Sequence, residues 1–173
     1  MTCAVLAVQG AFVEHERRLG ELGVDCIELR QASDLSHPFD RLILPRGEST
    51  VQGKLLDELG MLEGLRLRIE DGMPTLATCA GLILLARRLT ARDDRGTPRL
   101  KTMDITAERN AYGRQLGSFH TRAAFANQEN VPMTFIRAPY IAQTGPSVTV
   151  LAEVDGRVVA AQEGSQPAVA FHP

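Results

Sequence analysis

The segment Leu76-Ala77-Thr78-Cys79-Ala80-Gly81-Leu82 is the part of the sequence that decides the fold. A short apolar run, Thr75–Ala77, reaches a turn of small residues, and an apolar run with helical potential, Leu82–Ala86, follows at once. This order is typical of a strand-to-helix elbow that carries a nucleophile, because such a strained turn needs small neighbours. The N–H groups and the dipole at the start of the helix favour a thiolate at Cys79. The alternative is a buried cysteine that packs as a small hydrophobic side chain.

The elbow belongs to an alternating series of strand and helix signals in the first half of the chain. A short continuous apolar run predicts a buried strand at Val5–Val8, and further strands are expected at Val24–Leu29 and Leu42–Leu44. A helix is expected at Phe12–Leu22, and another ends at Asp71 before Gly72. Ser49 and Gln52 have the spacing of a capping box, which predicts a helix start after the third strand. A β-α-β series of this kind builds a parallel sheet.

Beyond about residue 100 the pattern changes to strands joined by short turns. We expect these strands at Met103–Ala107, Ser118–Phe125, Thr134–Ile136, Val148–Glu153 and Val158–Gln162. Asp155-Gly156 is a strong hairpin signal between the last two. The sequence therefore predicts the α/β class: a three-layer α/β/α sandwich with a mixed, mainly parallel sheet, as one domain over residues 1–173. In such sheets, ligands bind at the carboxyl ends of the parallel strands.

Composition excludes several classes of function. A formal net charge of −2 argues against a general nucleic-acid binder. No apolar stretch approaches the roughly 20 residues that span a bilayer, so we expect no membrane segment. The three cysteines are an odd number at wide spacing, which indicates free thiols in a reducing cytoplasm and neither a disulfide framework nor a metal site. We expect no cofactor.

A cysteine nucleophile needs a nearby base, usually histidine. His15 is expected on the polar face of the first helix, His37 in a loop and His120 within a strand, so each is interpreted as structural or solvated. His172 differs because it follows the apolar run Ala168–Phe171 and therefore lies at a strand end. It is the candidate base, and the alternative is a histidine that merely ends an edge strand.

Six short motifs add specificity. They are Gln9-Gly10, Leu44-Pro45-x-Gly47-Glu48-Ser49-Thr50, Thr78-Cys79-Ala80-Gly81-Leu82, Glu108-Arg109-Asn110-x-x-Gly113-Arg114-Gln115, Phe135-Ile136-Arg137-Ala138-Pro139 and Phe171-His172-Pro173. In this order they closely resemble the class I (triad) glutamine amidotransferases, and among these the glutaminase subunits of pyridoxal 5′-phosphate synthase. The resemblance covers nearly the whole chain.

The resemblance implies hydrolysis of L-glutamine to L-glutamate and ammonia, with ammonia passed to a partner synthase subunit that builds pyridoxal 5′-phosphate (vitamin B6). It assigns Cys79 as the nucleophile and His172 as the base and then the acid. It implies an oxyanion hole from the backbone N–H groups of Gly47 and Ala80. The positions that it implies for glutamine binding are Gly47, Glu48, Ser49, Arg109, Ile136 and Arg137.

Other interpretations of these residues remain open at this point. Arg109 or Arg137 could serve a structural ion pair, and Glu48 could cap the helix that starts near it. The chain could also be another triad glutaminase, in histidine or purine biosynthesis, or a weakly active regulatory homologue.

The chain departs from the family in three places. The family's triad ends with a glutamate two residues after the histidine, whereas this sequence stops at Pro173, and the family's C-terminal helix is missing as well. Either the sequence lacks its C-terminus or the molecule lacks the residue that orients His172. Arg46 stands where relatives carry glycine, which would strain the loop if that position required positive φ. Ala77 replaces a usual glycine and is small enough to be accepted.

Overall fold

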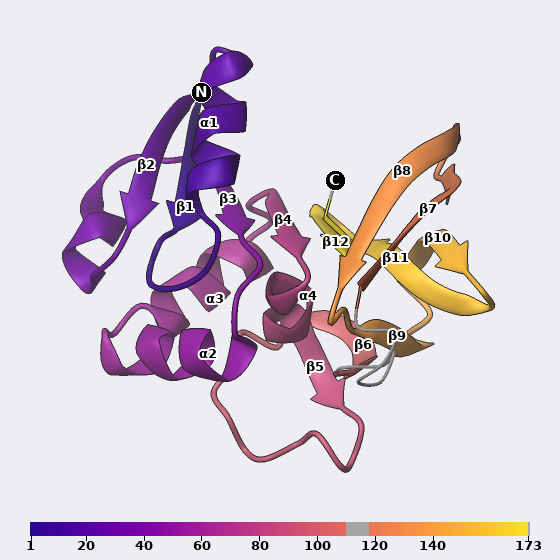
Figure 1. The fold of residues 1–173 in the computed structure, drawn as a ribbon. Helices are drawn as coiled ribbons and strands as arrows, with labels where there is room; N and C mark the ends of the chain where they lie inside the picture. The colour runs from indigo at the N-terminus through magenta and orange to yellow at the C-terminus, as the bar shows by residue number, and fades with distance from the viewer. Residues whose placement is uncertain (110–117, 173) are drawn as a thin grey trace.

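The central sheet carries strands from both halves of the chain in the computed structural model, which describes residues 1–109 and 118–172 (Figure 1). Within these ranges it has ten strands, in the order β2-β1-β3-β4-β12-β11-β9-β6-β5, with β10 paired to β11. Their bounds are β1 Thr2–Leu6, β2 Asp25–Leu29, β3 Arg41–Leu44, β4 Thr75–Thr78, β5 Ala86–Leu89, β6 Met103–Glu108, β9 Tyr140–Thr144, β10 Thr149–Val154, β11 Arg157–Glu163 and β12 Gln166–Val169.

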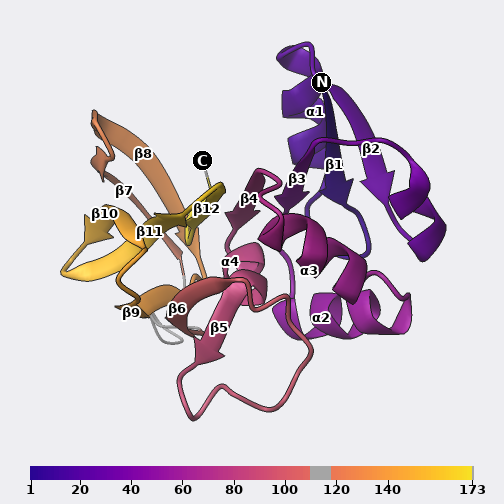
Figure 2. The same cartoon turned by 180° about the vertical axis from the view of Figure 1, so that it is seen from behind.

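Helices cover both faces of the first half of this sheet. Successive side chains of a strand point to opposite faces. Accordingly, Cys3 and Val5 of β1 pack with the cluster beneath α1 (Val13–Glu21), whereas Ala4 and Leu6 pack with Leu56 and Leu65 on the other face. The latter two come from α2 (Ser49–Glu58) and α3 (Leu62–Glu70). The two opposite views place α1 and α3 on opposite sides of the sheet (Figures 1 and 2).

Two further strands form a separate hairpin. These are β7 (Ser118–Phe125) and β8 (Gln128–Ile136), which pair antiparallel. The end of β8 meets the last described residues through an antiparallel bridge between Thr134 and His172. Phe135 of β8 and Phe171 also pack edge to face, with ring centroids 5.8 Å apart. The hairpin therefore fixes the position of the chain just before its last residue.

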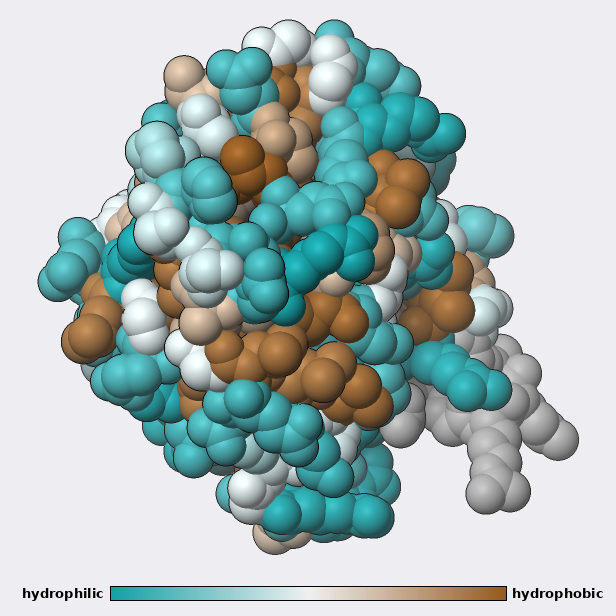
Figure 3. All heavy atoms as spheres, turned by 90° about the vertical axis from the view of Figure 1, so that its left-hand side faces the viewer, coloured by the Kyte–Doolittle hydropathy of each residue, from teal (hydrophilic) through white to brown (hydrophobic). Residues whose placement is uncertain are grey.

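The face that carries β2, α2 and α3 has apolar side chains gathered across its middle (Figure 3). The exposed large apolar residues of these elements include Leu67 of α3 and Leu59 at the end of α2. Among the described residues, none of the helices is both long and apolar enough to cross a membrane.

The predicted fold class is confirmed, because the sheet is mixed, has a parallel first half and is flanked by helices. The hairpin at Asp155-Gly156 is confirmed between β10 and β11. Strands β5 and β9 were not predicted, and a one-turn 3-10 helix, η1, lies at Ala32–Ser36. The predicted strand at Thr134–Ile136 is the end of the longer β8.

The predicted capping box is wrong. Glu48, not Ser49, is the N-cap of α2, and its carboxylate accepts the N–H of Val51 at 3.0 Å. Gln52 instead donates its side-chain amide to the carbonyls of Gln9 and Pro45. Ser49 is the first residue of the helix and is buried. A carboxylate is a good cap because it meets both the free N–H groups and the positive end of the helix dipole.

One glycine allows α4 (Ala80–Leu85) to lie directly against β3. A Cβ on Gly81 would lie 2.3 Å from the carbonyl oxygen of Leu44 and 2.8 Å from its Cβ. These are atoms of a buried strand, which has no room to move. Gly20 of α1, by contrast, has nothing within 4 Å of the same position.

We therefore predict that Gly81→Ala lowers the free energy of unfolding by about 1–3 kcal/mol or more, the usual cost of overpacking a filled core. Gly20→Ala is the matched control and should raise it by about 0.5–1 kcal/mol, because alanine favours the helix and meets no atom. Urea unfolding measures both. Equal effects of the two substitutions would contradict the close packing of α4 on β3.

Candidate active site

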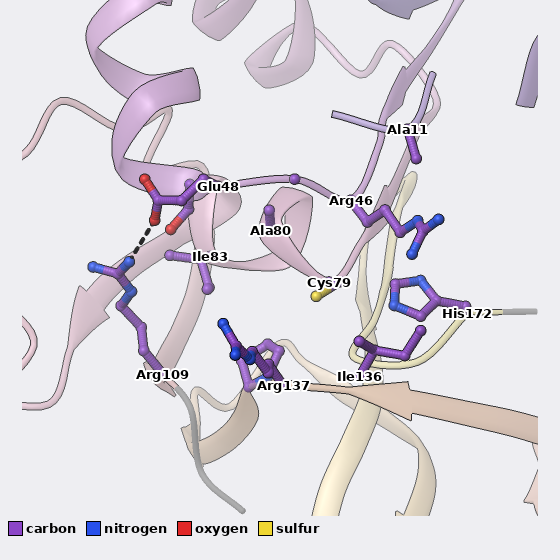
Figure 4. A pocket seen from close by; sticks show the side chains of 13 residues that line it. Ala11, Arg46, Glu48, Cys79, Ala80, Ile83, Arg109, Ile136, Arg137 and His172 are labelled. Atoms are coloured by element: carbon purple, nitrogen blue, oxygen red, sulfur yellow. Dashed lines mark hydrogen bonds and ion pairs between the residues drawn. The ribbon is translucent and has the colours of Figure 1, made fainter. Parts of the chain in front are cut away.

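All nine residues singled out from the sequence line one cavity of about 430 Å³ (Figure 4). It lies where the chain leaves β3, β4 and β8, and Ala80 and Ile83 of α4 line one side of it. The nine residues are Gly47, Glu48, Ser49, Cys79, Ala80, Arg109, Ile136, Arg137 and His172, and the lining also includes Ala11, Arg46, Ile83 and Pro139. Residues far apart in the sequence therefore meet at one edge of the sheet, at the carboxyl ends of parallel strands.

Cys79 forms the turn between β4 and α4. Its backbone has φ 50° and ψ −99°, a conformation that L-residues rarely adopt. Its N–H donates to the carbonyl of Val169 at 2.8 Å, and its own carbonyl accepts the N–H of Leu82 at 3.1 Å. Such backbone strain costs about 1–3 kcal/mol and is typical of functional sites. The turn directs the sulfur into the cavity, which the ring of His172 also lines (Figure 4).

The surroundings of Cys79 keep its thiol protonated. Burial raises the pKa of Cys79 to about 11, although the backbone N–H of Ala80 and the charge of Arg46 lower it. The sequence-based expectation of a thiolate favoured by the helix start is therefore wrong for the net effect. Desolvation disfavours the charged form more than one N–H and one partly exposed cation favour it.

His172 lies beside the sulfur and is held by its backbone. Its N–H donates to the carbonyl of Thr134 at 2.8 Å, and its carbonyl accepts the N–H of Thr134 at 3.3 Å. Burial, together with the positive charge of Arg46 and with His15, lowers the pKa of His172 to about 4. Among the described residues, no hydrogen-bond partner orients its ring. At neutral pH the site therefore holds a thiol and a neutral imidazole.

A second cavity, of about 740 Å³, lies on the other side of His172 and reaches α1. His15 lines it, and its Nε2 lies 3.5 Å from the hydroxyl of Thr78. Burial lowers the pKa of His15. The expectation that His15 lies on a solvated face is thus wrong, because α1 crosses the sheet with this residue turned toward β4. His37 and His120 are exposed and outside both cavities.

The loop after β3 is tightly fitted around Gly47. A Cβ on Gly47 would lie 2.4 Å from Oε1 of Gln9, which accepts the N–H of Glu48 at 2.9 Å. In the described part of the chain, the N–H of Gly47 has no hydrogen-bond acceptor, and Gly47 and Ala80 both line the cavity. Arg46 is not among the described residues with positive φ, so the strain considered for this position does not arise.

Three arginines line the cavity, and among the described residues two of them, Arg46 and Arg109, have an ion-pair partner. Arg109 donates to Glu48 at 2.8 Å, and the same carboxylate caps α2 (Figure 4). The structural ion pair considered for Arg109 and the helix cap considered for Glu48 are therefore both present. Arg137 is exposed, follows β8 with φ 45°, and has no ion-pair partner among the described residues. It is a cation available to an anionic ligand.

The predicted positions Asn110, Gly113, Arg114, Gln115 and Pro173 lie outside the described residues. Arg46 and His15 are the two site-facing residues that sequence reasoning did not assign to the site, although Arg46 was noted as unusual beside the oxyanion loop. Within residues 1–109 and 118–172, no group of three or more His, Cys, Asp or Glu side chains could hold a metal ion.

An elbow cysteine that faces a histidine on this sheet defines a class I glutamine amidotransferase. A crystal structure of a glutamine amidotransferase that is 38% identical superposes with a TM-score of 0.91, covering 99% of this chain and 89% of that one. The model of the SNO glutamine amidotransferase family matches residues 5–173, and the chain belongs to that family.

Two curated relatives match the whole chain. Pyridoxal 5′-phosphate synthase subunit PdxT of Methanocorpusculum labreanum is 58% identical over 173 residues, which are 100% of this chain and 89% of that protein. The protein of the same name from Desulfitobacterium hafniense is 53% identical, over 85% of its length. A putative GMP synthase protein from Thermoplasma acidophilum is 20% identical with a TM-score of 0.65, over 100% of this chain and 84% of that one, and shows the fold alone.

Proposed function

We propose that this chain hydrolyses L-glutamine to L-glutamate and ammonia, and supplies the ammonia to a partner synthase subunit for pyridoxal 5′-phosphate biosynthesis. The observation that carries the proposal is the convergence of Cys79, His172 and the unpaired N–H of Gly47 on one cavity. The names of the two relatives, at 58% and 53% identity, support the vitamin B6 branch. The solved structure of the putative GMP synthase protein is only 20% identical, so it gives no support to the purine alternative.

The first half of the reaction forms a thioester. The sulfur of Cys79 attacks the carboxamide carbon of glutamine while the thiol proton passes to His172. The charge that develops on the carboxamide oxygen lies at the N–H groups of Gly47 and Ala80. His172 then returns the proton to the leaving nitrogen, the C–N bond breaks, and ammonia departs from a γ-glutamyl thioester.

The second half restores the thiol. His172, neutral again, takes a proton from water as the water oxygen attacks the thioester carbon. The C–S bond breaks, glutamate leaves, and the proton returns to the sulfur of Cys79. Because burial disfavours both the thiolate and the imidazolium, the ion pair is costly before glutamine binds and is stabilised only when the oxyanion site is occupied.

The charges of the cavity suit the amino-acid end of glutamine. The unpaired guanidinium of Arg137 can bind the α-carboxylate in two hydrogen bonds. Glu48 can accept the α-ammonium, and Arg109 holds the Glu48 carboxylate in place through their 2.8 Å contact. Ser49 and Ile136 line the path between these charges and Cys79.

A heteromeric complex and a cytoplasmic location complete the proposal. The relatives are named as synthase subunits, which supports a partner synthase. Cys3, Cys26 and Cys79 are free, which suits a reducing compartment. By family resemblance, docking of the partner raises the activity. We treat residues 1–173 as one glutamine amidotransferase domain.

The chain mixed with its partner synthase should release ammonia from glutamine, measured by coupling to glutamate dehydrogenase. Cys79→Ala should abolish the release while circular dichroism and partner binding stay unchanged. Absence of release by the wild-type complex would leave only the regulatory alternative. Substantial turnover by Cys79→Ala would refute the assigned nucleophile.

Arg137→Ala should raise KM for glutamine about 10- to 100-fold, because it removes a charged hydrogen-bond partner of the substrate. Arg109→Ala should also weaken glutamine binding, but less, since Arg109 acts through Glu48. Arg122→Ala, an exposed arginine of β7 outside both cavities, is the control. If Arg137→Ala leaves KM unchanged, the α-carboxylate is bound elsewhere.

A glutamate added directly after Pro173 stands where the family has its orienting carboxylate. It should raise kcat of the 173-residue chain by orders of magnitude, since loss of such a group from a comparable triad costs about 10⁴-fold. A glutamine added at the same place is the matched control and should not. Equal rates of the two extended chains would show that His172 needs no orienting carboxylate.

A further inference from the structure

Arg46 stands at the boundary of the two cavities. It lines both of them, together with Ala11, Ile136 and His172. Its side chain extends from the loop toward the ring of His172 (Figure 4). None of the steps described above uses this side chain, although it is the cation beside the reacting pair.

Both the backbone and the side chain of Arg46 are anchored to the segment that leads into α1. Its carbonyl accepts the N–H of Ala11 at 3.0 Å, and Gly10 lies so close that a Cβ there would be 2.1 Å from this oxygen. Its Nη2 lies 3.4 Å from Oε1 of Glu14 on α1. These contacts hold the guanidinium where it is, although the side chain is 39% exposed.

The other charged groups around Cys79 and His172 do not supply the positive charge that Arg46 supplies. From α1, His15 faces His172, and Glu14 is the partner of Arg46 itself. Arg17 and the Arg18–Glu21 ion pair line the second cavity, but they are not among the charges that shift the pKa of His172. From β8, Thr134 and Ile136 bring no charge, and Arg137 after it lines the first cavity only. The Arg109–Glu48 pair is internally compensated.

We propose that Arg46 is a positioning residue of the glutaminase reaction: its guanidinium, tethered to α1 through Glu14, holds a positive charge against the Cys79–His172 pair. The inference rests on the proposed function. The charge favours a thiolate on Cys79 and disfavours an imidazolium on His172, so it keeps the histidine neutral as a base. The negative charge of attack then develops beside a fixed cation.

The sign of the expected effect follows from Coulomb's law. Arg46 lowers the pKa of both Cys79 and His172, so Arg46→Gln should raise both. Alkylation of Cys79 needs the thiolate, and catalysis needs neutral His172. Both the alkylation profile and the acidic limb of kcat/KM should therefore move to higher pH. One partly exposed charge contributes a shift of about 0.2 to 0.7 pH.

The test measures the rate of iodoacetamide alkylation between pH 6 and 10, with Cys79 resolved from Cys3 and Cys26 by peptide mass spectrometry. Arg46→Gln should slow alkylation of Cys79 about 1.5- to 5-fold at each pH, the same shift expressed as a rate. Arg46→Lys keeps the charge and should recover at least half of the loss. Arg122→Gln, which removes an exposed arginine of β7 outside both cavities, is the control and should leave the rate unchanged.

Three results would overturn the proposal: a wild-type rate in Arg46→Gln, an equal loss in Arg46→Lys, or an equal loss in Arg122→Gln. A thermal melt confirms that each variant is folded. Because alkylation requires no glutamine, this readout stands even if the chain releases no ammonia. Where ammonia is released, the acidic limb of kcat/KM must move in the same direction as the alkylation profile.

Discussion

The hydrogen bond from the N–H of Cys79 to the carbonyl of Val169 is the contact on which the site depends. It continues the parallel pairing of β4 with β12, in which Ala77 lies beside Ala168 and Thr78 beside Val169. The strand that carries the nucleophile is thereby joined to the strand that leads to His172. Residues 93 positions apart in sequence are neighbours because two strands of one sheet are neighbours.

The same arrangement explains why the elbow can hold an unfavourable backbone. Cys79 is anchored by β12 on one side and by the first turn of α4 on the other, so relaxing its φ would break both. Gly81 lets that turn lie on Leu44 of β3, the strand that leads into the loop of Gly47. Burial follows from this compactness, and burial in turn keeps the thiol and the imidazole uncharged. The charge of Arg46 acts on both members of this pair and lowers the pKa of each.

Much of the fold could be predicted from local sequence, for identifiable reasons. β1, β3 and β4 are short continuous apolar runs because both of their faces are covered, and Asp155-Gly156 marks its hairpin by turn chemistry. β5 was missed because Arg87 and Arg88 interrupt its apolar residues, and its pairing with β6 is non-local. The helix cap was misassigned because Glu48 and Ser49 are adjacent and both are plausible caps.

The site was predictable where one residue type in one local setting carries the chemistry, as for Cys79 and His172. The roles of His15 and Arg46 depend on how α1 crosses the sheet, which no local pattern encodes. The balance at Cys79 was misjudged for a similar reason. A helix start is visible in the sequence, whereas the depth of burial that outweighs it arises from β12, β8 and the loop after β3 together.

The central claim is that Cys79 carries the glutamyl group during turnover. Acid quenching of the complex with its partner synthase within milliseconds of mixing with glutamine, followed by peptide mass spectrometry, tests it directly. The account predicts a glutamyl adduct on the peptide that contains Cys79, and none on the peptides of Cys3 or Cys26. Ammonia release without any adduct on Cys79 in the quenched samples would contradict it.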